Sequence, residues 1–600
     1  MITQNPILST FSFSSVVQFR QNWIRWAFGF FFLAVCLGLV MRSFHVVEIP
    51  YFEYRNILHT HSHLALLGWG HLMLLGGIVF GLVKEKDQVK DYKWLFLGTI
   101  LSLLGMLFSF PFQGYGVISI SFSTLHVLLS YGFAYKLLKV IRSIEKTPAT
   151  RLIRLAIWFM VISTFGLWSL GPISATLGRM HELYFMTIQW FLHFQLNGWF
   201  VLGVLGLILL FFEEKGFKIT WTAYQEWILS ISVILTFMLA VTWAEPRPIF
   251  FQINGLAVII QLIAYSWILK SVFILLNSNQ LKGFAQLLLI LALASLVAKA
   301  ILQGLLVFPS IAVISYSIRM YVIGFLHLVL LGAMTMGVSA VAIARGWISE
   351  QPISRLGWIL MISGFVITEF LLFLQGTLIW LKMGFLPEYN FWLFLASCLF
   401  PLSLAFLFAG LRSNEFSNQS ISNSKTRLQK RINPETMRKT MIWSMGVLGI
   451  LLTSCGGGSG ESSNSTATEI APKEEVKADP KGIGEFKTVE IGEGIDETLA
   501  ASGKAIVDMK CTACHQLNDK RLVGPGFQGV TNRRRPEWIM NMITNVDVML
   551  DQDPAAQKLL EECLTRMPNQ NITLDDARGI LEFMRKNDEE KAGQRDAATK

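Results

Sequence analysis

Long runs of hydrophobic residues, separated by short polar loops, fill the chain as far as about residue 415. Each run has about 20 residues or more, the length that an α-helix needs to cross roughly 30 Å of hydrocarbon. We therefore predict an all-α bundle of about twelve spanning helices. The predicted spans are residues 22–44, 61–83, 94–113, 117–140, 152–176, 183–212, 225–244, 249–277, 284–308, 318–345, 356–382 and 391–412.

The loops between these spans carry an uneven charge. Loops after the even-numbered spans are basic, as in KEKDQVKDYK and KVIRSIEKTPATRLIR, whereas EPRP and KMGFLPEYN on the other side are poorer in Lys and Arg. Because basic loops stay in the cytoplasm, we expect the N-terminus and residue 415 to be cytoplasmic. The net charge of +10 then has a topological cause and does not indicate a nucleic-acid partner.

Composition agrees with a membrane protein that has a polar tail. The chain is 53% hydrophobic and 15% charged, with a mean hydropathy of +0.49. A soluble protein of this length would have several globular domains with about 25% charged residues. The six cysteines are too few and too scattered for a disulfide framework.

A pattern typical of an export signal lies far inside the chain. Residues 441–454 are apolar, follow the basic start of the stretch MRKTMIW and lead into LTSC, whose cysteine is Cys455. This pattern is typical of a bacterial lipoprotein signal, and it would carry the following residues across the membrane. Two outcomes stay open: cleavage with lipidation at Cys455, or an uncleaved thirteenth helix. Residues 456–494, rich in Gly, Ser, Pro and charge, predict a flexible tether with a reach of about 35 Å.

CTACH is the most specific motif in the chain and comprises Cys511, Cys514 and His515. Two cysteines at this spacing can bind both haem vinyl groups, and the adjacent histidine can bind the iron. Met567, which precedes a proline, is the predicted second axial ligand. His/Met ligation raises the reduction potential and suits electron transfer.

Residues 495–590 resemble class I cytochrome c, through CTACH, the turn VGPGFQGV, the Met-Pro pair and the closing helix ITLDDARGILEFMRK. More narrowly, they are similar to bacterial lipoprotein cytochromes c often encoded beside nitrous oxide reductase. The resemblance implies a covalent haem c, attached outside the cytoplasm, which agrees with the topology predicted from the loops.

Six histidines lie in or at the start of the apolar spans: His61, His63, His71, His126, His193 and His327. Polar side chains in hydrocarbon cost free energy, so they usually serve a function or a hydrogen bond between helices. His126, His193 and His327 lie about nine or ten residues into spans that start outside, or about 13–15 Å deep. A layer of imidazoles at one depth is what a haem in a helical bundle requires.

Twelve spans with histidines in the second, sixth and tenth resemble subunit I of the haem-copper oxidases, including the cbb3-type and nitric oxide reductase branches. Two segments carry the resemblance, HTHSHLALLGWG and GFLHLVLLGAMTMG. It implies a low-spin haem b between His61 and His327, with His63 as the other candidate in the second span.

The chain departs from this family at the copper site. Phe325 stands where the high-spin haem ligand belongs, Asn197 stands where many oxidases have Tyr, and the seventh span has no histidine. His193 is then a remnant copper ligand, and one imidazole cannot hold copper alone. The oxygen-reducing site is lost, or it is rebuilt from His71, His126, His181 and His193 with Glu182.

Two charged residues inside the spans need a role of their own. Lys299 in the ninth span is the expected partner of a haem propionate, at a depth of about ten residues. Glu369 in the eleventh span is either a proton relay or a polar group satisfied by a neighbouring helix.

These features predict four regions: a haem-copper-oxidase-like membrane domain (1–415), a cytoplasmic linker with the internal signal (416–455), the tether (456–494) and a cytochrome c domain (495–600). The expected location is the bacterial inner membrane, with the cytochrome on the periplasmic side. The favoured function is respiratory electron transfer from a quinol or cytochrome-type donor, through haem b and haem c, to a periplasmic reductase. Two alternatives stay open: a terminal oxidase or nitric oxide reductase fed by its fused cytochrome, and an assembly or sensing protein.

Overall fold

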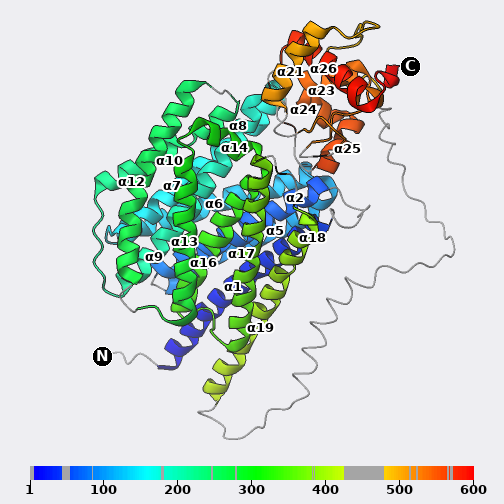
Figure 1. Ribbon diagram of the computed structural model, residues 1–600. Coiled ribbons are helices and arrows are strands. Elements are labelled where there is room, and N and C mark those ends of the chain that lie inside the picture. The colour runs from blue at the N-terminus through cyan, green and yellow to red at the C-terminus, as the bar shows by residue number, and fades with distance from the viewer. Residues whose placement is uncertain are drawn as a thin grey trace, which may run out of the picture. The chain divides into compact units, whose positions relative to one another are not determined.

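The computed structural model describes residues 6–43, 54–83, 86–177, 181–244, 247–276, 280–381, 383, 386–423, 479–511, 515–519, 521, 524–563, 567, 570 and 572–599. Every regular element in these ranges is a helix. Twelve helical stretches among them are long and apolar enough to cross a membrane, which confirms the predicted all-α fold and its twelve spans. In Figure 1 these helices lie side by side as one bundle.

The twelve spans fall into three successive sets of four. The first set is α1 (Pro6–Ser43), then α2 (Tyr54–His63) with η1 (Leu64–His71) and α3 (Leu72–Leu82), then α5 (Lys93–Gln113) after the short α4 (Lys86–Lys90), then α6 (Val117–Ser143). The second set is α7 (Pro148–Thr176), then α8 (Glu182–His193) with η2 (Phe194–Phe200) and α9 (Val201–Glu214), then α10 (Ala223–Leu235) with α11 (Met238–Ala244), then α12 (Pro248–Leu276). The third set is α13 (Gly283–Leu305), then α15 (Arg319–His327) with η3 (Leu328–Thr335) and α16 (Met336–Ala344) after α14 (Pro309–Ser317), then α17 (Pro352–Trp380), then α18 (Tyr389–Ser397) with α19 (Leu399–Asn423).

The second span of each set contains a π-helical segment that starts directly after a histidine. In all three spans a glycine follows this histidine five residues later. The three pairs are His63 with Gly68, His193 with Gly198, and His327 with Gly332. π-Helical turns inside α-helices are rare and often mark functional sites. The repeat therefore points to three equivalent positions in the bundle.

Each of these glycines lets its helix approach the first helix of its own set. A Cβ on Gly198 would lie 2.4 Å from Phe159 Cβ in α7. The corresponding distances are 2.7 Å from Gly68 to Phe30 Cβ in α1 and 2.4 Å from Gly332 to Ser295 Oγ in α13. A side chain with a Cβ would not fit at these contacts. The same close contact, which requires glycine, therefore occurs three times.

The three π-containing spans form the centre of the bundle and are its most buried helices. Trp69 in η1 donates a hydrogen bond from Nε1 to Thr335 Oγ1 in η3 at 2.7 Å. Trp23 in α1 donates from Nε1 to the Leu72 carbonyl oxygen at 2.8 Å, where the π-segment ends. These indole groups would be costly to bury without an acceptor, so they fix the central helices against their neighbours.

The C-terminal domain, residues 479–599, is also helical wherever it is regular. Its elements are α21 (Glu497–Lys510), α22 (Val530–Arg533), α23 (Pro536–Thr544), α24 (Val546–Gln552), α25 (Pro554–Cys563), α26 (Leu574–Ala592) and η4 (Ala597–Thr599). Helix α21 packs on α26 across Gly503 and Gly579, whose backbones meet without side chains between them. The core contains Val507, Trp538 and Ile580.

The internal signal, Cys455 and residues 456–478 of the predicted tether lie outside the described residues. Residues 479–494, which the sequence assigned to the tether, are described and pack on the C-terminal domain, where the Phe486 backbone N–H donates to Asn541 Oδ1 at 3.0 Å. The predicted boundaries at 415, 455 and 494 stay predictions.

Candidate haem-binding sites

His61 projects from α2 towards α1. Its Nδ1–H donates to the Ala34 carbonyl oxygen at 2.8 Å. A carbonyl can only accept, so the ring hydrogen is on Nδ1 and the lone pair on Nε2 is left for a metal. Gly38 makes room for the ring, because a Cβ there would lie 3.0 Å from His61 Cε1. This is the hydrogen-bonded arrangement of a metal-binding histidine.

His63 points in another direction, because two residues along an α-helix turn the side chain by about 200°. Its Nδ1–H donates to the His59 carbonyl oxygen at 2.8 Å. Its ring lies against Phe110, with centroids 4.4 Å apart, and near Tyr115 at 5.9 Å. The two candidates that the sequence left open therefore point to different sides of the helix, each with its Nδ1–H on a backbone carbonyl oxygen.

His327, the last residue of α15, belongs with His61. Arg42 and His61 both lie close enough to His327 to act on it electrostatically. Glu369 in α17 lies beside His327, with Oε1 3.8 Å from Nδ1. Within the described residues, neither Glu369 oxygen nor His327 Nδ1 has a hydrogen-bond partner. The assignment of His61 and His327 to the two axial positions of a haem iron stays a prediction.

His193 lies in a different environment and has both ring nitrogens engaged. Its Nε2–H donates to the Val233 carbonyl oxygen at 2.8 Å, and its Nδ1 accepts from Asn197 Nδ2 at 3.3 Å. Neither nitrogen is left for a metal ion in this arrangement. His193 and Asn197, which the resemblance places at the copper site, are hydrogen-bonded to protein groups instead.

The polar chain continues from Asn197 to a buried lysine. Gln303 donates from Nε2 to Asn197 Oδ1 at 3.5 Å and accepts from Lys299 Nζ at 2.6 Å. The ammonium also lies 5.2 Å from the ring centroid of Tyr265 and 5.8 Å from that of Phe325. Lys299 is therefore surrounded by an amide and two aromatic rings, and Gln303 links it to Asn197, which is hydrogen-bonded to His193.

The sequence did not reveal how the remaining histidines lie. His181 is exposed at the start of α8 and accepts from the Leu183 backbone N–H at 3.2 Å, as expected for a loop residue. His71 and His126, in contrast, are fully buried and adjacent, with ring centroids 5.2 Å apart. Nothing in their spacing along the chain predicts this pairing. The His-x₄-Gly repeat, however, was readable in the sequence and marks the central spans.

In the C-terminal domain, His515 is held in the orientation that a haem ligand needs. Its Nδ1–H donates to the Pro525 carbonyl oxygen at 2.9 Å, which leaves Nε2 for iron. Phe527 stacks on the ring at 4.7 Å, and a Cβ on Gly524 would lie 2.3 Å from His515 Cε1. Burial lowers the pKa of His515, so the ring is in the neutral form that binds metal.

The other predicted ligands are placed in part. Cys511 follows the end of α21, whereas Cys514 lies outside the described residues. Met567 is half-buried and packs against the domain core. The fully buried Met549 is a poor competitor, since its sulfur accepts a hydrogen bond from the Ile483 backbone N–H at 3.0 Å. The residues present therefore fit a covalent haem with His515 and Met567 as axial ligands.

Residues 500–588 match the cytochrome c family. These residues form a cytochrome c domain. Among solved structures, a cytochrome c from Rhodothermus marinus is 38% identical, covering 19% of this chain and 100% of that chain with a TM-score of 0.18. An engineered cytochrome c from the same organism is 37% identical, covering 18% of this chain and 99% of that chain, also with a TM-score of 0.18. No curated protein matches the chain.

The match covers the cytochrome c domain only, so the likeness of the membrane domain to haem-copper oxidases stays a prediction. A cytochrome c domain implies a covalently bound haem c and supports electron transfer. The ligands assigned to haem b rest on the geometry described above.

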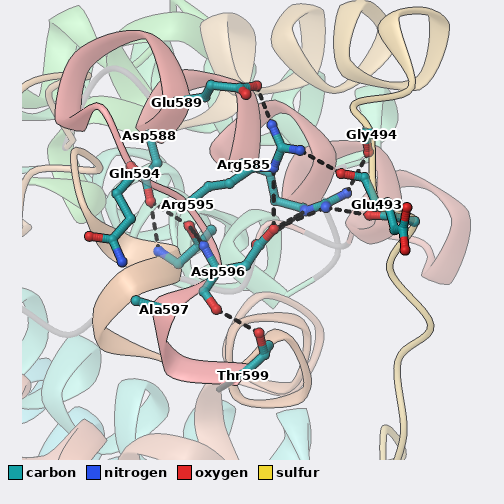
Figure 2. A network of polar contacts seen from close by, with 12 residues as sticks. Glu493, Gly494, Arg585, Asp588, Glu589, Gln594, Arg595, Asp596, Ala597 and Thr599 are labelled. Atoms are coloured by element: carbon teal, nitrogen blue, oxygen red, sulfur yellow. Dashed lines mark hydrogen bonds and ion pairs between the residues drawn. The ribbon is translucent and has the colours of Figure 1, made fainter.

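A network of polar contacts centred on the buried Arg585 joins α26 of the cytochrome c domain to neighbouring segments (Figure 2). Arg585, 1% exposed, binds Glu582 Oε1 at 2.8 Å and Asp596 Oδ2 at 2.9 Å. It also donates to the Gly492 carbonyl oxygen at 2.7 Å and to that of Gly494 at 3.3 Å. Residues before α21 and after α26 are thereby tied to the helix that packs on α21.

The pKa values of two carboxyl groups in this region are shifted in opposite directions. Burial acts to raise the pKa of Glu582, but hydrogen bonds from Arg578, the Asp496 backbone and Arg585 outweigh it and lower that pKa. Asp588 accepts from Thr531 Oγ1 at 2.6 Å and from the Thr531 backbone N–H at 2.8 Å. Burial nevertheless raises the pKa of Asp588.

Proposed function

We propose that this protein carries electrons in a respiratory membrane, from a quinol or cytochrome-type donor to a periplasmic acceptor such as a denitrification reductase. The cytochrome c domain is the observation that carries this proposal. Haem held by its residues would supply reversible one-electron chemistry at the iron. Cys511 and Cys514 would anchor the group, and His515 and Met567 would hold the two axial positions.

The membrane domain would contribute a haem b site between His61 and His327. The Ala34 carbonyl fixes the orientation of His61, and Gly38 leaves the space that its ring needs. Glu369, beside His327, is the acceptor available to the Nδ1–H of that ring. As a proton relay, it would act at this site and not in a separate channel.

The surroundings of His193 favour electron transfer over a terminal oxidase or nitric oxide reductase. Such an enzyme needs several metal ligands next to a second haem, but here His193 is bound to Val233 and Asn197. The ammonium of Lys299 lies near Phe325, where the family's high-spin ligand would be. A buried cation beside this position opposes the binding of a second positive ion.

We place the protein in the bacterial inner membrane as a multi-pass protein, with the cytochrome c domain on the periplasmic side. Twelve apolar spans support the membrane location. An even number of spans would leave residue 415 on the side of the N-terminus, so residues 441–454 would make the further crossing. Lipidation at Cys455 belongs to the same proposal.

Reduction of haem c by quinol tests this function. Full-length protein in anaerobic lipid vesicles is mixed with a reduced quinone analogue, and the c-type absorption band is followed. We expect reduction in the wild type and in the control His181→Ala, and slow or no reduction in His327→Ala. Equal rates in all three would contradict the membrane path. Sustained consumption of oxygen or nitric oxide by the wild type would instead support the terminal reductase.

A further inference from the structure

A pair of histidines away from both haem sites has an unusual arrangement. His71, the last residue of η1, and His126 in α6 are each 2% exposed, and their ring centroids are 5.2 Å apart. Neither takes part in the sites described above. The question is which atoms of the two rings are already used.

Two serines fix the tautomers of these rings. Ser130 Oγ donates its only hydrogen to the His126 carbonyl oxygen at 2.9 Å, so towards His71 Nε2, at 3.3 Å, it can only accept. Ser102 Oγ likewise donates to the Thr99 carbonyl oxygen at 2.8 Å and accepts from His126 Nδ1 at 3.2 Å. With the serine hydrogens on these carbonyl oxygens, the ring hydrogens are on His71 Nε2 and on His126 Nδ1.

The two remaining nitrogens carry lone pairs that nothing satisfies. Within the described residues, His71 Nδ1 and His126 Nε2 are buried and have no hydrogen-bond partner. Buried polar atoms without partners are rare and costly, and they often mark an ion or a water. A second group that binds the opposite nitrogen of each imidazole is the usual environment of a metal-binding histidine.

We propose that His71 Nδ1 and His126 Nε2 bind one monovalent copper ion. Two imidazoles that bind one ion at about 2.0 Å, with an angle of about 110–120° between them, place their ring centroids about 5.2–5.5 Å apart. The observed 5.2 Å agrees with this arrangement. The separation of the two rings is therefore compatible with one ion held between them.

Charge and ligand number favour copper(I) over a divalent ion. No group of three or more His, Cys, Asp or Glu that could hold a metal occurs in the described part of the chain, so the pair has no third ligand of this kind. Zinc would require four ligands and would bring two uncompensated charges into an apolar interior. Copper(I) brings one charge, suits imidazole ligands and accepts low coordination numbers.

A water hydrogen-bonded to Trp199 would be the third ligand of the ion. The Trp199 ring lies 5.4 Å from that of His71, and its Nε1 is also buried without a partner among the described residues. An indole N–H can only donate, so it cannot bind the ion itself. A water on the copper would accept from Trp199 Nε1, which satisfies all three unpartnered atoms at once.

His193 provides an internal comparison. It also lies on one of the central helices, but protein groups occupy both of its ring nitrogens. Within the described residues, His327 Nδ1 also lacks a partner, but only at His71 and His126 do two such ring nitrogens belong to adjacent rings. The proposal also does not depend on the electron-transfer function, because these residues belong to neither haem site.

Copper content of the full-length protein tests the site. Protein reconstituted anaerobically with copper(I) is exchanged against a copper(I) chelator, and copper, haem b and haem c are measured in each sample. We expect one copper per chain in the wild type and in His181→Ala, and none in His71→Leu or His126→Leu with both haems retained. X-ray absorption should show nitrogen or oxygen ligands only.

Milder variants keep the test decisive if the leucine variants do not fold. Ser130→Ala and Ser102→Ala remove only the second hydrogen bond of each ring, and we expect about 10–100-fold weaker copper binding. Unchanged affinity in both variants would overturn the proposal. So would sulfur ligands in the absorption spectrum, which would place the copper on a cysteine, or a wild type that binds no copper, which would leave a bridging water only.

Discussion

The two candidate haem sites of this chain are built in opposite ways. In the cytochrome c domain, the iron ligand His515, its hydrogen-bond acceptor Pro525 and the stacked Phe527 lie within thirteen residues of one another. In the membrane domain, His61 and His327 come from the second and tenth spans, and the acceptor of His61 is in the first.

The difference shows which kind of haem site a sequence motif can reveal and which kind it cannot. A local site survives as a short pattern because one loop supplies the ligand and the groups that orient it. A site between remote helices depends on how those helices rotate against each other, and a rotation of two residues exchanges His61 for His63. The predictions below test whether the remote site is as specific as the local one.

The largest expected effect is the complete loss of the b-type absorption band in His61→Ala. His63→Ala is the matched control, two residues away on the same helix, and it should keep the band because its ring faces Phe110. Reduced-minus-oxidised spectra of the full-length protein distinguish the two variants. Loss of haem b in His63→Ala alone would reverse our assignment.

The second effect concerns the stability of the cytochrome c domain. Arg585→Met leaves the buried carboxylate of Glu582 without this partner, and breaking such a pair costs about 3–5 kcal/mol. Thermal unfolding followed by the c-type band should show a large drop in the melting temperature. Lys586→Met, next along the same helix but at the surface, is the control and should melt like the wild type. A similar melting temperature for both variants would mean that the network does not stabilise the domain.

The third effect compares space around the two ligand histidines. Gly524→Ala puts a Cβ 2.3 Å from the His515 ring, and overpacking of this kind costs about 1–3 kcal/mol. Gly38→Ala puts one 3.0 Å from the His61 ring and should disturb the b-type spectrum less than Gly524→Ala disturbs the c-type spectrum. Gly29→Ala, whose Cβ would lie 3.9 Å from Phe408, is the control on the same helix as Gly38. A disturbance in Gly29→Ala equal to that in Gly38→Ala would show that the helix, not the histidine, responds.

The smallest effect is a pH dependence. Because the folded protein lowers the pKa of Glu582, this group adds stability above its unfolded pKa of about 4.3, and the contribution is lost as the pH falls through the folded value. Asp588, whose pKa is raised, contributes with the opposite sign. We expect Glu582→Gln to flatten the acid side of the stability profile, measured by denaturant unfolding at several pH values. An unchanged slope would assign acid sensitivity to other groups.

The sequence by itself determined the all-α class, the twelve spans and the cytochrome c domain. Hydrophobic length is enough to find a spanning helix, because the bilayer sets a fixed thickness. CTACH is enough to find a haem c, because its ligands are adjacent in the chain. Neither inference needs to know which helices are neighbours.

Only the tertiary structure decided which histidines are neighbours and which ring nitrogens are occupied. It sets the His71 and His126 rings 5.2 Å apart, engages both nitrogens of His193, and leaves one nitrogen of His71 and one of His126 without a partner among the described residues. Histidines in different spans have no fixed relation in sequence, since their contacts depend on helix rotation and on close approaches such as the one at Gly38. The hydrogen bonds that set each tautomer come from backbone and serine oxygens, which no pattern of residue types reveals.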